Sequence, residues 1–123
     1  MSRAVTVEVN ARTVTDPTAG GVPTAAGVLM ITPPITEDYW LARVPLGGGQ
    51  AIVCFPKFMT IGIGFQRETD WNTNLPYSCP DEEIYEHIKH NQGRRCRASK
   101  AVVLDAIRLI QAWAAAYKTR ARS

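Results

Sequence analysis

The chain has 123 residues, of which 46% are hydrophobic and 20% are charged. This length suits one folded domain rather than two, and the composition argues against intrinsic disorder. The formal net charge of +3 at pH 7 is smaller than a strong nucleic-acid binder usually carries. Because no segment approaches the roughly 20 apolar residues of a membrane span, we expect a single domain over residues 1–123 and no membrane partner.

The cysteine pattern and the first residues indicate the compartment. Cys54, Cys79 and Cys96 are an odd number of cysteines and form no CxxC pair, which favours a reducing environment over a disulfide framework. The segment 1–5 lacks the apolar core of a signal peptide. We therefore expect a cytoplasmic protein.

The mild average charge hides an uneven distribution. Residues 1–87 contain five Lys and Arg against ten Asp and Glu, whereas residues 88–123 contain nine against one. The C-terminal third is therefore basic, and an anionic partner is expected to bind there rather than to the acidic remainder.

The N-terminal two thirds of the sequence predict an antiparallel sheet of about five strands. Val5, Val7 and Val9 alternate with polar residues, the pattern of a half-buried strand. Apolar or alternating runs predict the other strands at residues 28–32, 39–45, 51–55 and 58–65. Three glycines at 47–49 are expected to close the third and fourth strands into a hairpin.

Two helices are expected after the sheet, which gives the α+β class. The first begins at Pro80, with acidic residues in its first turn, and ends before Gly93. The second runs from about Ser99 to about Lys118, and its apolar residues cover roughly half of the helix circumference. Leu104 is expected on the polar side of this helix.

The wide apolar arc of the second helix leaves two interpretations open. The helix either lies between the sheet and the first helix, or also packs against another copy of the chain in a homo-oligomer.

An irregular segment over residues 66–79 is longer than most connections, which favours a functional loop. An aromatic side chain that stacks on a base contributes about 1–3 kcal/mol to binding, and an asparagine amide matches the hydrogen-bonding edge of adenine. This segment contains residues of both kinds. The alternative is structural, since asparagines form turns by themselves and a tryptophan can anchor a loop to the core. The candidate ligand-binding residues of this region are Phe65, Trp71, Asn72 and Asn74.

A second group of candidates lies at the start of the second helix. Arg94, Arg95 and Arg97 precede a helix N-terminus, where free backbone N–H groups attract anions and guanidinium groups bind phosphate in pairs of hydrogen bonds. The alternative is a solvated basic turn without a ligand.

The sequence offers little for catalysis. Cys79, His87, His90 and Cys96 match no standard zinc spacing, and Cys54 in its apolar strand is expected to be inert. We therefore expect no metal, no cofactor and no catalytic residue. Two alternatives stay open: a small nucleotide-processing enzyme that uses a histidine or a cysteine, and a nucleic-acid or protein-interaction module that uses the basic third.

Three motifs between Phe55 and Gly93 suggest a family. They are TIGIGF at 60–65, DWNTNLP at 70–76 and EIYEHIKHN at 83–91. Together, over about a third of the chain, they resemble the phage-encoded Thoeris anti-defence 1 proteins.

The resemblance implies a fold, a ligand and an assembly. Members of that family have an antiparallel sheet followed by two helices, and they sequester cyclic ADP-ribose isomers, made by TIR-domain immune enzymes, without cleaving them. Some members also bind cyclic oligonucleotides at separate sites. The resemblance further implies a homo-oligomer, a dimer or a larger assembly such as a hexamer, in the cytoplasm of the infected bacterial host.

The resemblance also assigns residue roles by position. Phe65 would stack on adenine, and Asn72 and Asn74 would make polar contacts to the ligand. Arg43 and the arginines at 94–97 are candidates for phosphate contacts from their charge alone.

Overall fold

A computed structural model describes residues 6–15, 27–65, 68–69, 74–92 and 97–121. The side chains of residues 65, 68–69, 92 and 119–121 are not described. The strands are β1 (Thr6–Asn10), β2 (Gly27–Ile31), β3 (Ala42–Gly47), β4 (Gln50–Phe55), β5 (Thr60–Phe65), β6 (Glu68–Thr69) and β7 (Leu75–Pro76), with two 3-10 turns, η1 (Ile35–Glu37) and η2 (Lys57–Met59). The helices are α1 (Asp81–Gln92) and α2 (Lys100–Ala121).

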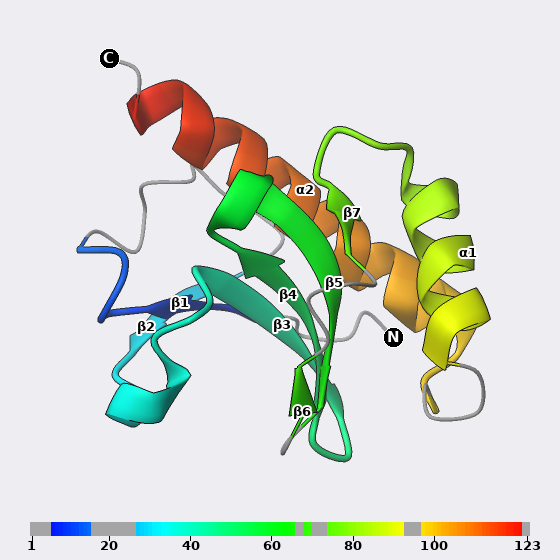
Figure 1. Cartoon of the computed structure of the whole chain (residues 1–123), viewed down its shortest axis with the longest axis horizontal. Helices are drawn as coiled ribbons and strands as arrows, with labels where there is room; N and C mark the ends of the chain where they lie inside the picture. The colour runs from blue at the N-terminus through cyan, green and yellow to red at the C-terminus, as the bar shows by residue number, and fades with distance from the viewer. Residues whose placement is uncertain (1–5, 16–26, 66–67, 70–73, 93–96, 122–123) are drawn as a thin grey trace.

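The strands form one sheet in the order β2-β1-β3-β4-β5-β6, and β7 also pairs with β5 (Figure 1). Every pairing is antiparallel except that of β1 with β2, which is parallel. The predicted α+β class, with an N-terminal sheet followed by two helices, is confirmed. The sheet is mostly antiparallel rather than wholly so, because β2 pairs with β1 in parallel. The predicted hairpin at 47–49 forms as well, because three successive glycines accept the positive φ angles of its turn.

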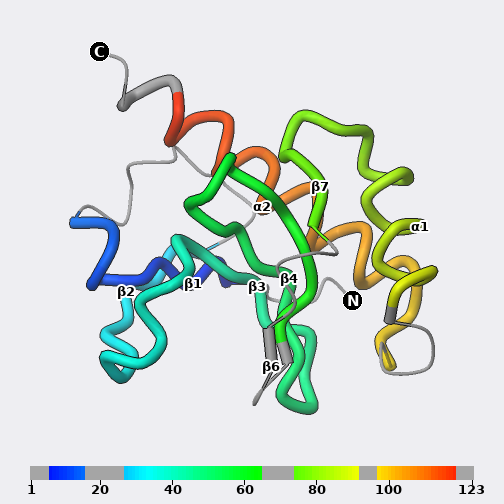
Figure 2. The backbone as a smooth tube through the Cα atoms, viewed as in Figure 1, coloured from blue at the N-terminus to red at the C-terminus, as the bar shows by residue number. Residues whose placement is uncertain are grey.

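Both helices pack on the same side of the sheet (Figure 1). The tube in Figure 2 follows the chain from β7 into α1 and back along α2, which crosses β3, β4 and β5. Ser99 caps α2, because its hydroxyl accepts the backbone N–H of Val102 at 3.4 Å and its carbonyl accepts that of Val103 at 3.0 Å. Neither described helix is long and apolar enough to cross a bilayer.

The main core lies between the helices and the sheet. Its strand residues alternate along the chain, and Ile107, Ile110 and Trp113 fill it from α2. Leu104, expected on the polar side of the helix, belongs to this core. The expectation was wrong because α1 packs against α2 and covers more of its circumference than the sheet alone would.

The polar side of α2 is also partly covered by this chain. The Gln111 side chain donates hydrogen bonds to the carbonyls of Tyr77 at 3.0 Å and Cys79 at 2.6 Å, which ties the segment before α1 to α2. The wide apolar arc is therefore largely explained by packing within one chain, the first of the two interpretations.

The opposite side of the sheet, which we call the open face, carries a smaller core. The residues between the buried positions of each strand point there, as the alternation of β-strands requires. Val53 and Phe55 from β4 pack with Trp40, the residue that leads into β3. β5 contributes Thr60, Gly62 and Gly64 to this face, where Asn74 lies over Gly62 and Val53 lies close to Gly64.

Asn10 joins the end of β1 to the segment before β3. Its side chain is completely buried, and its Nδ2 donates to the carbonyls of Glu37 and Trp40, each at 3.0 Å. Its Oδ1 accepts the backbone N–H of Arg12 at 2.9 Å. One amide thus satisfies three backbone groups and fixes the segment 37–40 on the open face.

We predict that Asn10→Ala destabilises the protein by about 1–3 kcal/mol or more, since it leaves buried backbone carbonyls without their donor. Urea unfolding followed by tryptophan fluorescence measures the change. Asn91→Ala is the matched control, because that asparagine is exposed on α1 and its loss should change stability by less than about 0.5 kcal/mol. Equal stability of the two variants would contradict the role assigned to Asn10.

Candidate functional site

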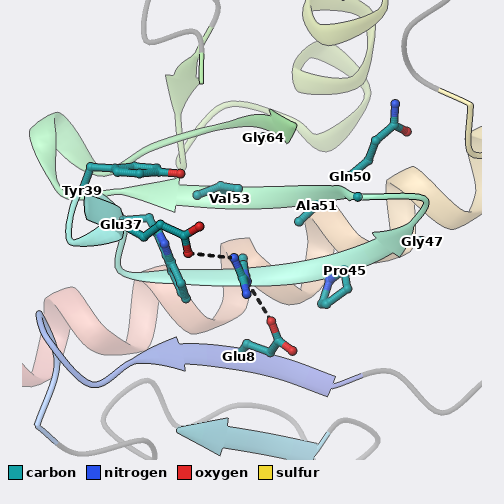
Figure 3. A pocket seen from close by; sticks show the side chains of 12 residues that line it. Glu8, Glu37, Tyr39, Pro45, Gly47, Gln50, Ala51, Val53 and Gly64 are labelled. Carbon is teal, nitrogen blue, oxygen red and sulfur yellow. Dashed lines mark hydrogen bonds and ion pairs between the residues drawn. The ribbon is translucent and has the colours of Figure 1, made fainter. Parts of the chain in front are cut away.

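A pocket of about 480 Å³ lies on the open face, in front of β3 and β4 (Figure 3). This volume falls within the roughly 300–1,000 Å³ typical of small-molecule sites. The residues around it come from β1, η1, β3, β4 and β5, and they are Glu8, Glu37, Tyr39, Trp40, Arg43, Pro45, Gly47, Gly49, Gln50, Ala51, Val53 and Gly64. It combines charged, aromatic and backbone surfaces in one concavity.

Arg43, which was predicted to bind phosphate, lines this pocket between two carboxylates. Its Nε donates to Glu8 Oε1 at 2.7 Å, and its guanidinium lies 3.9 Å from Glu37 Oε2, as the dashed lines in Figure 3 mark. The same guanidinium covers the ring of Trp40 at 4.5 Å from the centroid. These contacts come from β1, η1 and the segment before β3, and the antiparallel register of β1 and β3 places Arg43 opposite Glu8.

Tyr39 forms an aromatic wall of the pocket. Its ring stacks with that of Phe55 at 6.4 Å between centroids. Burial, and then the nearby Glu37 carboxylate, raise the pKa of the Tyr39 phenol above its usual value. The phenol therefore stays protonated at neutral pH and can donate a hydrogen bond.

Asn74 lies next to the pocket on the open face. A Cβ built on Gly62 would overlap the Asn74 Oδ1, so the amide occupies the space that this glycine leaves free. Gly62 pairs across the strands with Val53, which lines the pocket. Neither Oδ1 nor Nδ2 of Asn74 has a hydrogen-bond partner among the described residues, although both are shielded from solvent. Because both atoms are shielded and Asn74 does not line the pocket, a ligand reaches this amide only if the groups that shield it move.

Gln50 lies at the hairpin end of β4, and its side chain points to the helix side of the sheet, because it alternates with Ala51 and Val53 on the open face. On that side its Oε1 accepts the backbone N–H of Arg97 at 3.2 Å. The backbone of the exposed Arg97 therefore lies on the helix side of the hairpin end, whereas Arg43 lies on the open face near the start of β3.

Of the other predicted site residues, only Phe65 is partly described. It is the last residue of β5 and pairs with Gln50, while its side chain lies outside the described part. Trp71, Asn72, Arg94 and Arg95 lie outside the described residues altogether.

Of the residues that line the pocket, only Arg43 was predicted from the sequence; the charged and aromatic residues that were missed are Glu8, Glu37, Tyr39 and Trp40. Glu8 alternates with the valines of the first predicted strand. This alternation indicates on which face of the sheet Glu8 lies, but not which residue it contacts there. Glu37 and the two aromatics precede a strand in a short turn, where sequence gives no indication of what they face.

The described residues offer no cluster of three or more metal-ligating side chains. Cys54 is fully buried in the main core, and burial raises its pKa to about 12. It is therefore a protonated core residue at neutral pH, in agreement with the inert role expected for it.

Comparisons of this chain with protein-family models, with curated proteins and with solved structures found no match. The resemblance described above therefore stays a prediction, and the site is interpreted from its own geometry.

We predict that Gly62→Ala displaces the Asn74 amide, because the new methyl group and the amide oxygen cannot occupy the same space. The variant should lose about 1–3 kcal/mol of stability, and its Asn74 side-chain amide resonances should shift in the NMR spectrum. Gly27→Ala is the control, since a Cβ there meets its nearest neighbour at an ordinary 3.8 Å. Unchanged Asn74 resonances in the Gly62 variant would refute this packing.

We also predict that a thiol reagent at pH 8 modifies Cys79 in the folded protein but modifies Cys54 only after unfolding. Cys79 is partly exposed, whereas Cys54 is buried with a pKa of about 12. Peptide mass spectrometry with and without denaturant distinguishes the two. Modification of both at the same rate in the folded protein would show that the strand around Cys54 opens readily.

Proposed function

We propose that this protein binds a cyclic adenine nucleotide of the cyclic ADP-ribose class and holds it without cleaving it. In this proposal it acts as an anti-defence protein, which removes an immune signal from the cytoplasm of an infected bacterial cell. The observation that carries the proposal is the open-face pocket, which is lined by Arg43, two aromatic residues and two carboxylates; the shielded amide of Asn74 lies over Gly62 on the same face.

The chemistry of these groups suits a nucleotide. The asparagine amide offers a donor and an acceptor together, which is the arrangement that pairs with an adenine edge. Tyr39 supplies a flat surface for a ring.

The resemblance to the anti-defence family supports the choice of ligand class and the absence of cleavage. The resemblance also supports a homo-oligomeric assembly, which we include in the proposal.

We predict that isothermal titration calorimetry against a panel of cyclic ADP-ribose isomers finds one that binds with a Kd of ~1 μM or tighter. Arg43→Ala should weaken this binding by about tenfold to a hundredfold, because the pocket loses the hydrogen bonds of a charged guanidinium group and leaves its partners unpaired. Arg108→Ala is the matched control, since that arginine lies on α2 and pairs with Asp81 at 2.5 Å, outside the pocket.

Two results would contradict the proposal. One is the absence of binding for every isomer at high micromolar concentration by the folded protein. The other is recovery of the bound ligand as a linear product after heat denaturation, which would make the protein an enzyme.

A further inference from the structure

Arg43 is already engaged by protein groups in the pocket. Glu8 and Glu37 contact its guanidinium from two sides, and Trp40 covers one face of it. A phosphate entering here would have to displace a carboxylate or lie beside one. The acidic end of the pocket is therefore a poor place for an anion, and its ligand must be of another kind.

The two carboxylates keep the capacity to accept hydrogen bonds. Arg43 engages Oε1 of Glu8 and Oε2 of Glu37, and the second oxygen of each receives no hydrogen bond or ion pair from the described residues. Both side chains are partly exposed, 22% for Glu8 and 34% for Glu37. An ionised carboxylate only accepts hydrogen bonds and offers about four lone-pair sites, so each has room for a donor.

Neutral hydroxyl groups are the donors that fit this end. Hydrogen bonds from a hydroxyl to a carboxylate are short and strong, and they bring no charge into a pocket whose described side chains sum to one negative charge. Adjacent hydroxyls on one ring can reach two carboxylates that flank the same guanidinium. A carboxylate that binds the hydroxyls of ribose is a recurrent solution in nucleotide sites.

The other end of the pocket differs in character. Gly47 and Gly49 line it with backbone alone. Figure 3 shows Gly47 and Gln50 at one end of the strands, and Glu37 and Tyr39 at the other. The pocket therefore has an acidic part around Arg43 and a hairpin end that is lined by the backbone of glycines.

We propose that Glu8 and Glu37 form a ribose subsite that selects ligands with free vicinal hydroxyls, while the phosphates of the ligand lie away from these carboxylates, toward the backbone of Gly47 and Gly49. Arg43 then acts as a positioning residue, which holds the two carboxylates in place. This inference rests on the proposed function, because it assigns the sugar of the nucleotide to one end of the same pocket.

The test compares adenosine 5′-monophosphate with its 2′,3′-dideoxy analogue, which has the same base and phosphate but no vicinal hydroxyls. By calorimetry or NMR titration, the natural protein should bind the ribonucleotide about tenfold more tightly. Glu37→Gln should reduce this preference to less than about threefold, and Glu8→Gln should do the same. Asp38→Asn removes the same charge from the exposed neighbouring residue, and should leave the preference unchanged.

Equal binding of the two nucleotides by the natural protein would overturn the ribose subsite, and so would a preference that both glutamine variants retain. No binding of either nucleotide by the folded protein would overturn it as well. If a cyclic ADP-ribose isomer still binds in any of these cases, only the subsite fails. If no isomer binds either, the proposed function fails with it.

Discussion

The open face depends on the buried amide of Asn10. The segment from Glu37 to Trp40 has no strand of its own, and it is held against the sheet where that amide donates to two of its carbonyls. Thr13 adds a hydroxyl bond of 2.9 Å to the carbonyl of Trp40. Without these bonds the backbone carbonyls would lack partners in a dry environment, which costs free energy for each group. A polar residue at the centre of the packing therefore positions one wall of the pocket.

From this wall the arrangement of charges follows. Asn10 fixes Trp40, Trp40 supports the guanidinium of Arg43, and the guanidinium aligns the carboxylates of Glu8 and Glu37. On the other side of β4, Asn74 occupies the space that Gly62 leaves, and Gly64 lines the pocket. The site thus combines charged groups that hold one another in place with a strand edge that carries no side chain.

Local patterns predicted much of the fold. The alternation of Val7 and Val9, the glycines at 47–49 and Ser99 before the second helix each determine their own short segment, and the structure confirms those elements. Long-range relations were not predictable in this way. Pairing of Glu8 with Arg43 depends on the register of strands 35 residues apart, and burial of Leu104 depends on where α1 packs. The parallel pairing of β1 with β2 likewise has no local signal.

The most direct test of the central claim is a crystal structure of the protein with a bound cyclic ADP-ribose isomer. We predict an intact ligand in the open-face pocket, with its ribose hydroxyls on Glu8 and Glu37 and a polar group of its base within hydrogen-bond distance of the Asn74 amide. A ligand bound elsewhere on the chain, or a cleaved ligand in the pocket, would contradict the account.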